Sequence, residues 1–436
     1  MKEDFFKGRD IILFGFQPWE IQTGSNLVDM AFELAQHNRV LYVNRALNRA
    51  SVWNKKREPD IGDRHETIRQ ISKTLWVLNP ATVLESINWI GIAWLHDQLN
   101  RLNNRRLAGQ IRKAIIQLDF SKILLINDND FIRGRYLNEL LPCEACIFYL
   151  RDYLLGVSYF QRHGRRLEAA TIALCTMVAA NTAYLANYAK EWNSNSFDIG
   201  QGFYLNPALK EAVPDDLYSI PGPVIGYVGY ISTLRIDEAI LSGIATAFPQ
   251  CSLVLVGQTD EYNLPEGIAE IPNIYFLGRK PVTEVHRYIR GFDICINPQK
   301  LNPVTNGNYP RKIDEYLALG KPVVATKTAA MALFKDHVSL CTTPAEFIAA
   351  IAEILRSPDT HGSISARQQR MEFAGSHTWG RSMARLYNAY LIVKRKQALM
   401  PQTGTGMSKT GKIIRAITIC ALMAYLIFIY IKFMFF

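Results

Sequence analysis

The chain has little cysteine, and the cysteines it has are poorly arranged for crosslinks or metal binding. Seven cysteines, an odd number, are spread over the whole length, which suits a reducing compartment better than a disulfide framework. Cys143 and Cys146 form a lone C-x-x-C without a second pair or a nearby histidine. We therefore expect neither a disulfide scaffold nor a metal or redox centre at this motif.

Two further absences narrow the class of protein. The sequence shows no internal repeat of short period, so a repeat architecture is not expected. Residues 1–16 carry Glu3, Asp4 and Asp10, and their apolar run is too short for the h-region of an export signal. These absences together favour a chain that works in a reducing compartment.

The composition is that of a chain with large cores and a basic surplus. At 436 residues, with 49% hydrophobic and 20% charged residues, it is too long for one core and predicts two domains with accessory segments. The formal net charge is +10, and residues 394–415 hold six Lys or Arg and no acid. A cluster of this kind predicts a nucleic acid or an anionic membrane surface as a neighbour.

An apolar run follows this basic cluster and favours the membrane. Residues 413–431 contain one charge, Arg415, and Lys432 closes the run. A membrane span needs about 20 apolar residues, so we predict a transmembrane anchor at 412–432, with the preceding chain at the cytoplasmic face of the cell membrane. The partner would then be a membrane and no nucleic acid. The alternative is a hydrophobic helix docked on the protein itself.

Short apolar runs alternate with helical patterns through most of the chain, which indicates parallel α/β architecture. The predicted strands form two series: 10–16, 39–44, 74–79, 122–127, 146–150 and 177–180, then 223–229, 252–257, 274–278, 293–297, 322–326 and 338–342. Two doubly wound, Rossmann-like domains follow from this. Their predicted bounds are 1–205 and 206–377, then a closing helix at 378–396, a flexible basic linker at 397–411 and the anchor.

Ligands in open α/β sheets bind beyond the carboxyl ends of the strands, and in the first half these loops offer three candidates. Gly24 precedes a helix whose free N–H groups could meet an anion, although Ser25 there is equally an ordinary cap. The D-x-D at 128–130 could hold a divalent ion or simply turn the chain. Asp152 could act as a base or orient a sugar hydroxyl, or it could pair with Arg151.

The second half is richer, and residues 308–327 are its centre. Pro310 suits a first helical turn and Gly320 the position after the last one. The helix between them would point Lys312 at a phosphate and Glu315 at a pair of ribose hydroxyls. The alternative is an i, i+4 surface pair between Arg311 and Glu315. Earlier loops add further polar and glycine positions: Gly229, Arg235, Gly278 and Arg279.

Three segments in order, 224–237, 271–298 and 310–326, resemble the donor half of GT-B glycosyltransferases of family 4, notably the teichuronic-acid and exopolysaccharide type. The likeness spans about residues 10–392 and is strongest over 223–326. It implies a nucleotide-sugar donor, linked to UDP, GDP or dTDP, on the second domain. A saccharide or lipid-linked acceptor would lie on the first domain, and the sugar would transfer with retention, without an obligatory metal or other cofactor.

The resemblance also implies roles for single residues. Glu315 would bind the ribose, and Lys312 would stabilise the departing diphosphate. Gly278 and Arg279 would lie near the base, and the loop of Gly24 would approach the donor phosphates and the acceptor. Asp152 remains the candidate base on the acceptor side.

The sequence departs from the family pattern at two places. Gly307 stands where many members carry a glutamate that faces the donor sugar, so Asn306, Asn308 or the backbone would have to read that sugar. Residues 198–206 replace the usual Asn-Gly-Val-Asp turn. The alternatives are a catalytically inactive membrane-anchored scaffold and a GT-B nucleotide-sugar epimerase. The epimerase would need several catalytic acids and histidines, and none of the eight histidines lies in a convincing strand-end loop.

A second candidate for membrane contact is the stretch 86–118. It joins an aromatic start to a helical pattern rich in arginine. A basic amphipathic helix can lie on anionic lipid. Packing against the first sheet is the alternative.

Overall fold

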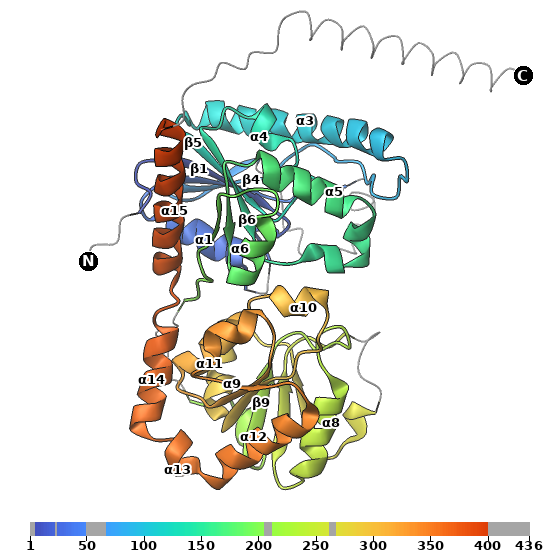
Figure 1. The fold of residues 1–436 in the computed structure, drawn as a ribbon, viewed down its shortest axis with the longest axis vertical. Helices are drawn as coiled ribbons and strands as arrows, with labels where there is room; N and C mark the ends of the chain where they lie inside the picture. The colour runs from blue at the N-terminus through green and yellow to red at the C-terminus, as the bar shows by residue number, and fades with distance from the viewer. Residues whose placement is uncertain (1–4, 22–23, 49–66, 205–211, 261–266, 400–436) are drawn as a thin grey trace, which may run out of the picture. The chain divides into compact units, whose positions relative to one another are not determined.

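The computed structural model describes residues 5–21, 24–48, 67–204, 212–260 and 267–399. The chain divides into two units, Met1–Val393 and Lys394–Phe436. The first unit contains two sheets (Figure 1), and we call the part built on each sheet the first and the second lobe.

The first lobe is an eight-stranded sheet in the order β3-β4-β2-β1-β5-β6-β7-β8. All neighbouring strands are parallel except β3 and β4, which are antiparallel. The strands are β1 (Asp10–Gly15), β2 (Arg39–Val43), β3 (Ile68–Ser72), β4 (Leu75–Leu78), β5 (Ile123–Asp128), β6 (Ala145–Leu150), β7 (Met177–Ala180) and β8 (Ser196–Asp198). The helical segments are α1 (Asn26–Ala35), α3 (Ala93–Gln117), α4 (Leu137–Leu140), η2 (Leu154–Gly156), α5 (Ser158–Leu174) and α6 (Ala183–Ala189).

Apolar residues cover both faces of this sheet, as a parallel sheet requires. Residues of α3, α5 and α6 form one core with alternate residues of the strands. Residues of α1 and of α15 (Trp379–Leu399) form the core on the other face (Figure 1). The chain therefore returns from the second lobe to complete the first.

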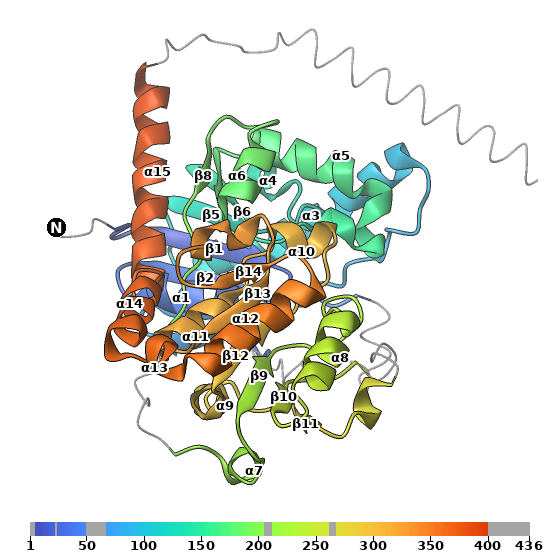
Figure 2. The same cartoon turned by 60° about the horizontal axis from the view of Figure 1, so that its bottom comes forward.

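The second lobe is a six-stranded parallel sheet in the order β11-β10-β9-β12-β13-β14. Its strands are β9 (Val224–Val228), β10 (Ser252–Val256), β11 (Ile274–Gly278), β12 (Ile294–Asn297), β13 (Val323–Thr326) and β14 (Ser339–Cys341). Its helical segments are α7 (Asp215–Tyr218), α8 (Glu238–Ala247), η3 (Ile268–Glu270), α9 (Val285–Gly291), α10 (Pro303–Gly307), α11 (Arg311–Ala318), η4 (Ala330–Phe334), α12 (Pro344–Arg356), α13 (Pro358–His361) and α14 (Ile364–Ala374). Helices α8 and α12 cover one face of the sheet and α9 and α11 the other (Figure 2).

The predicted pair of doubly wound α/β domains is confirmed, while several elements differ in detail. Strands β3 and β8 were not predicted, because both are short and only partly apolar. The helix expected over 86–118 begins only at Ala93. Leu107, Ile111 and Ile115 of this helix lie in the core beneath the first sheet, so this face of α3 packs on the sheet as the alternative proposed.

The expectation of a single-pass membrane protein requires correction. None of the helices within the described ranges is long and apolar enough to cross a membrane. The long helices α3 and α15 fail because each carries several Lys and Arg. The predicted anchor at 412–432 lies outside the described residues, as does the predicted linker beyond Leu399. The described residues therefore contradict the predicted membrane localisation.

Candidate active site

A cavity of about 980 Å³ is lined by residues of both lobes. From the second lobe it takes the carboxyl ends of β9 and β10, at Gly229 and Gly257, and one face of α11. From the first lobe it takes Gly24 and the start of α1. Ligands bind at this edge of open parallel sheets, so the cavity is the candidate site.

Two glycines let the loops after β9 and β10 meet inside this cavity. Gly229 has φ 149° and Gly257 has φ 153°, both unfavourable for residues with a side chain. A Cβ atom at Gly257 would lie 1.8 Å from the carbonyl oxygen of Gly229, and one at Gly229 would lie 2.4 Å from Nζ of Lys312. The lack of side chains at both glycines therefore lets the two loops and the amine of Lys312 pack closely together.

Helix α11 carries Lys312 and Glu315 to the cavity because its opposite face is apolar. Ile313, Tyr316 and Leu317 are completely buried in the core of the second lobe. The helix begins after Pro310 and ends before Gly320, whose φ of 69° suits glycine. The three buried side chains fix the rotation of the helix, so Lys312 and Glu315 face the cavity, whereas Asp314 is buried and accepts a hydrogen bond from the hydroxyl of Tyr309.

Lys312 has an unusual electrostatic environment. Its Nζ donates a hydrogen bond to the hydroxyl of Tyr227 over 2.8 Å and lies 4.0 Å from the centre of the same ring. Burial, with a smaller contribution from the positive charge of Arg235, lowers the pKa of Lys312 to about 7, although Glu315 acts in the opposite sense. The amine therefore titrates near neutral pH, and a bound anion would favour its charged form.

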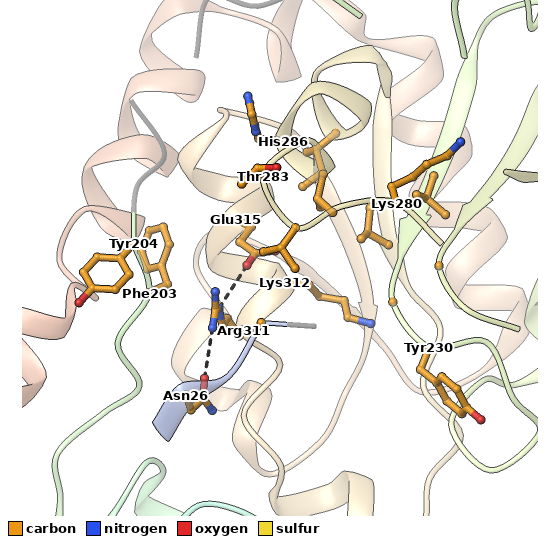
Figure 3. A pocket seen from close by; sticks show the side chains of 18 of the residues that line it. Asn26, Phe203, Tyr204, Tyr230, Lys280, Thr283, His286, Arg311, Lys312 and Glu315 are labelled. Atoms are coloured by element: carbon orange, nitrogen blue, oxygen red, sulfur yellow. Dashed lines mark hydrogen bonds and ion pairs between the residues drawn. The ribbon is translucent and has the colours of Figure 1, made fainter. Parts of the chain in front are cut away.

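Glu315 lines the cavity and also takes part in the pair that the sequence left open. Nε of Arg311 donates to its Oε1 over 3.2 Å. Nη1 of Arg311 donates to Oδ2 of Asp29 over 2.7 Å and to Oδ1 of Asn26 over 3.3 Å, both on α1. Figure 3 shows Arg311 between Asn26 and Glu315, with the amine of Lys312 directed away from them. The surface pair is thus part of a contact between the lobes.

On the first lobe, Arg151 lines the cavity, whereas Asp152 is not among the lining residues. Nε of Arg151 donates to Oδ1 of Asp128 over 2.7 Å, and Nη1 donates to Oδ2 of Asp152 over 2.8 Å. Burial raises the pKa of Asp128, and the charge of Arg151 only partly offsets this. Asp152 therefore sits in the salt bridge that was the alternative to its role as a base.

The D-x-D motif at 128–130 has both of its carboxylates engaged. Arg151 holds the first, and Nε of Arg133 donates to Oδ2 of Asp130 over 2.6 Å. Among the described residues, no group of three or more His, Cys, Asp or Glu is placed to hold a metal ion. The motif turns the chain at the end of β5.

The other predicted site residues divide into two groups. Gly24, Gly229, Arg235, Arg279, Lys312 and Glu315 all line the cavity. Gly278, Asn306 and Asn308 are not among the lining residues. Oδ1 of Asn306 instead accepts a hydrogen bond from the backbone N–H of Ala329.

The structure explains why glycine stands at position 307. A Cβ atom there would lie 2.5 Å from Cδ1 of Tyr184 of α6. The carbonyl oxygen of Gly307 also accepts a hydrogen bond from the hydroxyl of Thr182 over 3.4 Å. A glutamate could not enter without displacing the tyrosine, so α6 of the first lobe takes the space that a larger side chain would need.

Several lining residues were missed by the sequence analysis, among them Gln17, Asn26 and Asp29 of the first lobe and Lys280 and His286 of the second. Asn26 and Asp29 lie in the first turn of α1, just after Gly24. The sequence could have marked them as polar residues beside the glycine that was predicted to approach an anion. Their contact with Arg311 links residues more than 280 positions apart. No local pattern reports such a contact.

Comparisons with known proteins show which family and which fold the chain resembles. Residues 222–357 match the protein family described as Glycosyl transferases group 1. TuaH of Bacillus subtilis (strain 168), named as a candidate teichuronic acid biosynthesis glycosyltransferase, is 28% identical over 200 residues, which are 42% of this chain and 47% of that protein. The chain thus matches about half the length of this curated relative.

Solved structures show the same fold at low identity. The α,α-trehalose 6-phosphate synthase of Burkholderia multivorans is 11% identical with a TM-score of 0.64, over 90% of this chain and all of that one. HepE of Anabaena, in complex with UDP and glucose, is 16% identical with a TM-score of 0.58, over 88% of this chain and 99% of that one. The comparisons confirm the predicted GT-B-like fold and indicate an enzyme of the transferase class, as predicted.

Proposed function

We propose that the chain is a family 4 glycosyltransferase that moves a sugar from a nucleotide-sugar donor to a saccharide or lipid-linked acceptor in the synthesis of surface polysaccharides. One observation carries this proposal. Lys312 and Glu315 project from one helix into a cavity at the carboxyl ends of β9 and β10, within the segment that matches glycosyl transferases group 1. The teichuronic acid relative supports the choice of acceptor class.

The donor would lie across the second lobe. Its diphosphate would meet Lys312 beside Gly229, because an ammonium group favours phosphate oxygens. The ribose hydroxyls would donate to the carboxylate of Glu315, and the base would extend toward Arg279. HepE was solved with UDP and glucose, which supports UDP as the first nucleotide to test.

Catalysis in this proposal depends mainly on the leaving group. Bond cleavage at the sugar places negative charge on the diphosphate, and the ammonium of Lys312 would stabilise that charge. Arg235 lies near enough to act on Lys312 electrostatically and would add a second positive charge. An oxygen of the leaving diphosphate would accept the proton of the acceptor hydroxyl, because Asp152 is paired with Arg151 and is not assigned the role of base. The configuration at the sugar carbon would be retained.

The acceptor would enter from the first lobe, beside Gly24 and Arg151. The loop before α1 lies against the second lobe here, since a Cβ atom at Gly24 would be 3.5 Å from Nη2 of Arg311. A sugar bound at Lys312 and an acceptor beside Gly24 would thus share one cavity. In this proposal no resident cofactor is needed, because Lys312 and Arg235 would supply the positive charge that stabilises the leaving diphosphate.

Binding followed by turnover tests the proposal. The full chain is titrated with UDP, GDP and dTDP by isothermal calorimetry, and we expect one of them to bind at micromolar concentration. Nucleotide sugars of the bound class are then screened with saccharide acceptors, with mass spectrometry as the readout. Failure of all three nucleotides to bind would overturn the enzyme reading, and binding without transfer to any acceptor would favour the inactive scaffold.

A further inference from the structure

Within the described part of the chain, Arg311 is the side chain of α11 that forms ion pairs with both lobes. Its guanidinium bonds Asp29 of the first lobe over 2.7 Å and Glu315 of the second over 3.2 Å. About a quarter of the Arg311 side chain is exposed, and Asp29 is less exposed still, at 19%. The contact is therefore sheltered enough to matter energetically, unlike a fully exposed surface pair.

We propose that Arg311 is a positioning residue that ties Glu315 to helix α1, so that donor recognition and the approach of the Gly24 loop occur together. The proposal rests on the proposed function, because it assigns Glu315 to the ribose. It adds a specific coupling between the lobes. Arg311 itself would touch neither the sugar nor the phosphates.

The geometry leaves Glu315 able to bind a ligand while Arg311 holds it. Arg311 occupies one position on Oε1, and Oε2 has no hydrogen-bond partner among the residues that the structure describes. A carboxylate has about four acceptor positions, so most remain for ribose hydroxyls. Anchoring one oxygen restricts the rotation of the side chain, which reduces the entropy lost when the ribose binds.

The same guanidinium sets the position of the Gly24 loop. Asn26 and Asp29, its partners on α1, lie within the first four residues of that helix. Gly24 lies directly before them, in van der Waals range of the guanidinium. A side chain that holds Glu315 for the donor therefore also holds the loop beside which the acceptor would bind.

Two other roles for Arg311 predict different changes in nucleotide affinity. If Arg311 were itself a phosphate ligand, releasing it from Asp29 would leave nucleotide affinity unchanged or raise it. If Arg311 blocked Glu315, removing Arg311 would raise affinity. A positioning role requires that a change at Asp29 and a change at Arg311 each lower the nucleotide affinity. The two losses should not add, because both act through Arg311.

A double-mutant cycle on the full chain tests this, with UDP as the probe, or GDP or dTDP if wild type prefers one of them. We expect Asp29→Asn to weaken binding about fivefold and Arg311→Gln about tenfold. In the Arg311→Gln background, Asp29→Asn should have no further effect, because Asp29 acts only through Arg311. Arg311→Lys should recover part of the loss, since an ammonium can keep one of the two contacts.

Glu33→Gln is the matched control. Glu33 lies on the same helix and loses the same charge, but its carboxylate accepts from Tyr204 and not from Arg311. We expect its affinity to stay within about twofold of wild type. Thermal unfolding of every variant checks folding, and Asn26→Ala replaces Asp29→Asn if the latter fails to fold.

The outcomes separate this inference from the proposed function. Additive losses, or tighter binding after Asp29→Asn or Arg311→Gln, would overturn the positioning role while the nucleotide site stands. Wild type that binds none of the three nucleotides would overturn the proposed function and this inference with it. Once the donor and acceptor are known, Asp29→Asn should also raise the KM for the acceptor, because it breaks the ion pair between Arg311 and α1. Loss of a purely structural salt bridge would not change this KM.

Discussion

The affinity for a nucleoside diphosphate should depend on pH through Lys312. Its pKa is lowered to about 7 by burial and by Arg235, so about half of the amines are charged at pH 7 and about one in a hundred at pH 9. A bound diphosphate favours the charged form and raises the pKa. Affinity is therefore fully present below pH 7 and is lost as the pH rises above it.

The size of the effect follows from the lowered pKa. Charging the amine at pH 9 costs about 2.7 kcal/mol, so UDP affinity should fall roughly fiftyfold between pH 7 and pH 9 if the bound amine keeps its proton. This window lies above the last ionisation of a terminal phosphate, at about pH 6. The phosphates of the ligand therefore add little pH dependence of their own.

Calorimetry measures this directly. Titrations at pH 8 in two buffers of different ionisation enthalpy should show uptake of about one proton per UDP bound. Lys312→Arg is the matched control, because a guanidinium stays protonated throughout and should bind with nearly constant affinity. Affinity that changes less than about threefold between pH 7 and pH 9, with no proton uptake, would refute the assignment of Lys312 to the diphosphate.

Three further predictions test other parts of the site. Glu315→Ala should weaken UDP binding at least tenfold by calorimetry, since charge-assisted hydrogen bonds to the ribose are lost, and unchanged affinity would leave Glu315 only its ion pair. Gly307→Glu should destabilise the fold by about 1–3 kcal/mol in denaturant unfolding because it clashes with Tyr184, and a second change, Tyr184→Ala, should recover part of that loss if the clash is the cause. Arg151→Ala should cost about 3–5 kcal/mol because Asp128 would remain buried without its partner, so a loss below about 1 kcal/mol would contradict the pairing.

The sequence was most informative where periodicity and burial act locally. Apolar runs such as 223–229 and 252–257 belong to strands buried on both faces, and the observed strands β9 and β10 lie within them. The face of α11 that bears Lys312 and Glu315 followed from the spacing of three apolar residues. Strand β3 escaped prediction because it is an edge strand that pairs with β4, and none of its five residues is fully buried.

The sequence by itself determined that two parallel α/β lobes would form, and it offered Lys312 and Glu315 of one helix as candidate ligand residues while leaving the Arg311–Glu315 pair as the alternative. Hydrophobic periodicity and the position of a residue after a strand are local properties, so one chain suffices to read them. Only the tertiary structure decided that Asp152 pairs with Arg151, that Tyr184 excludes a side chain at Gly307, and that Arg311 bridges to Asp29. The last two contacts join distant segments of the two lobes, and the first depends on Asp128 of the neighbouring strand, which also holds Arg151.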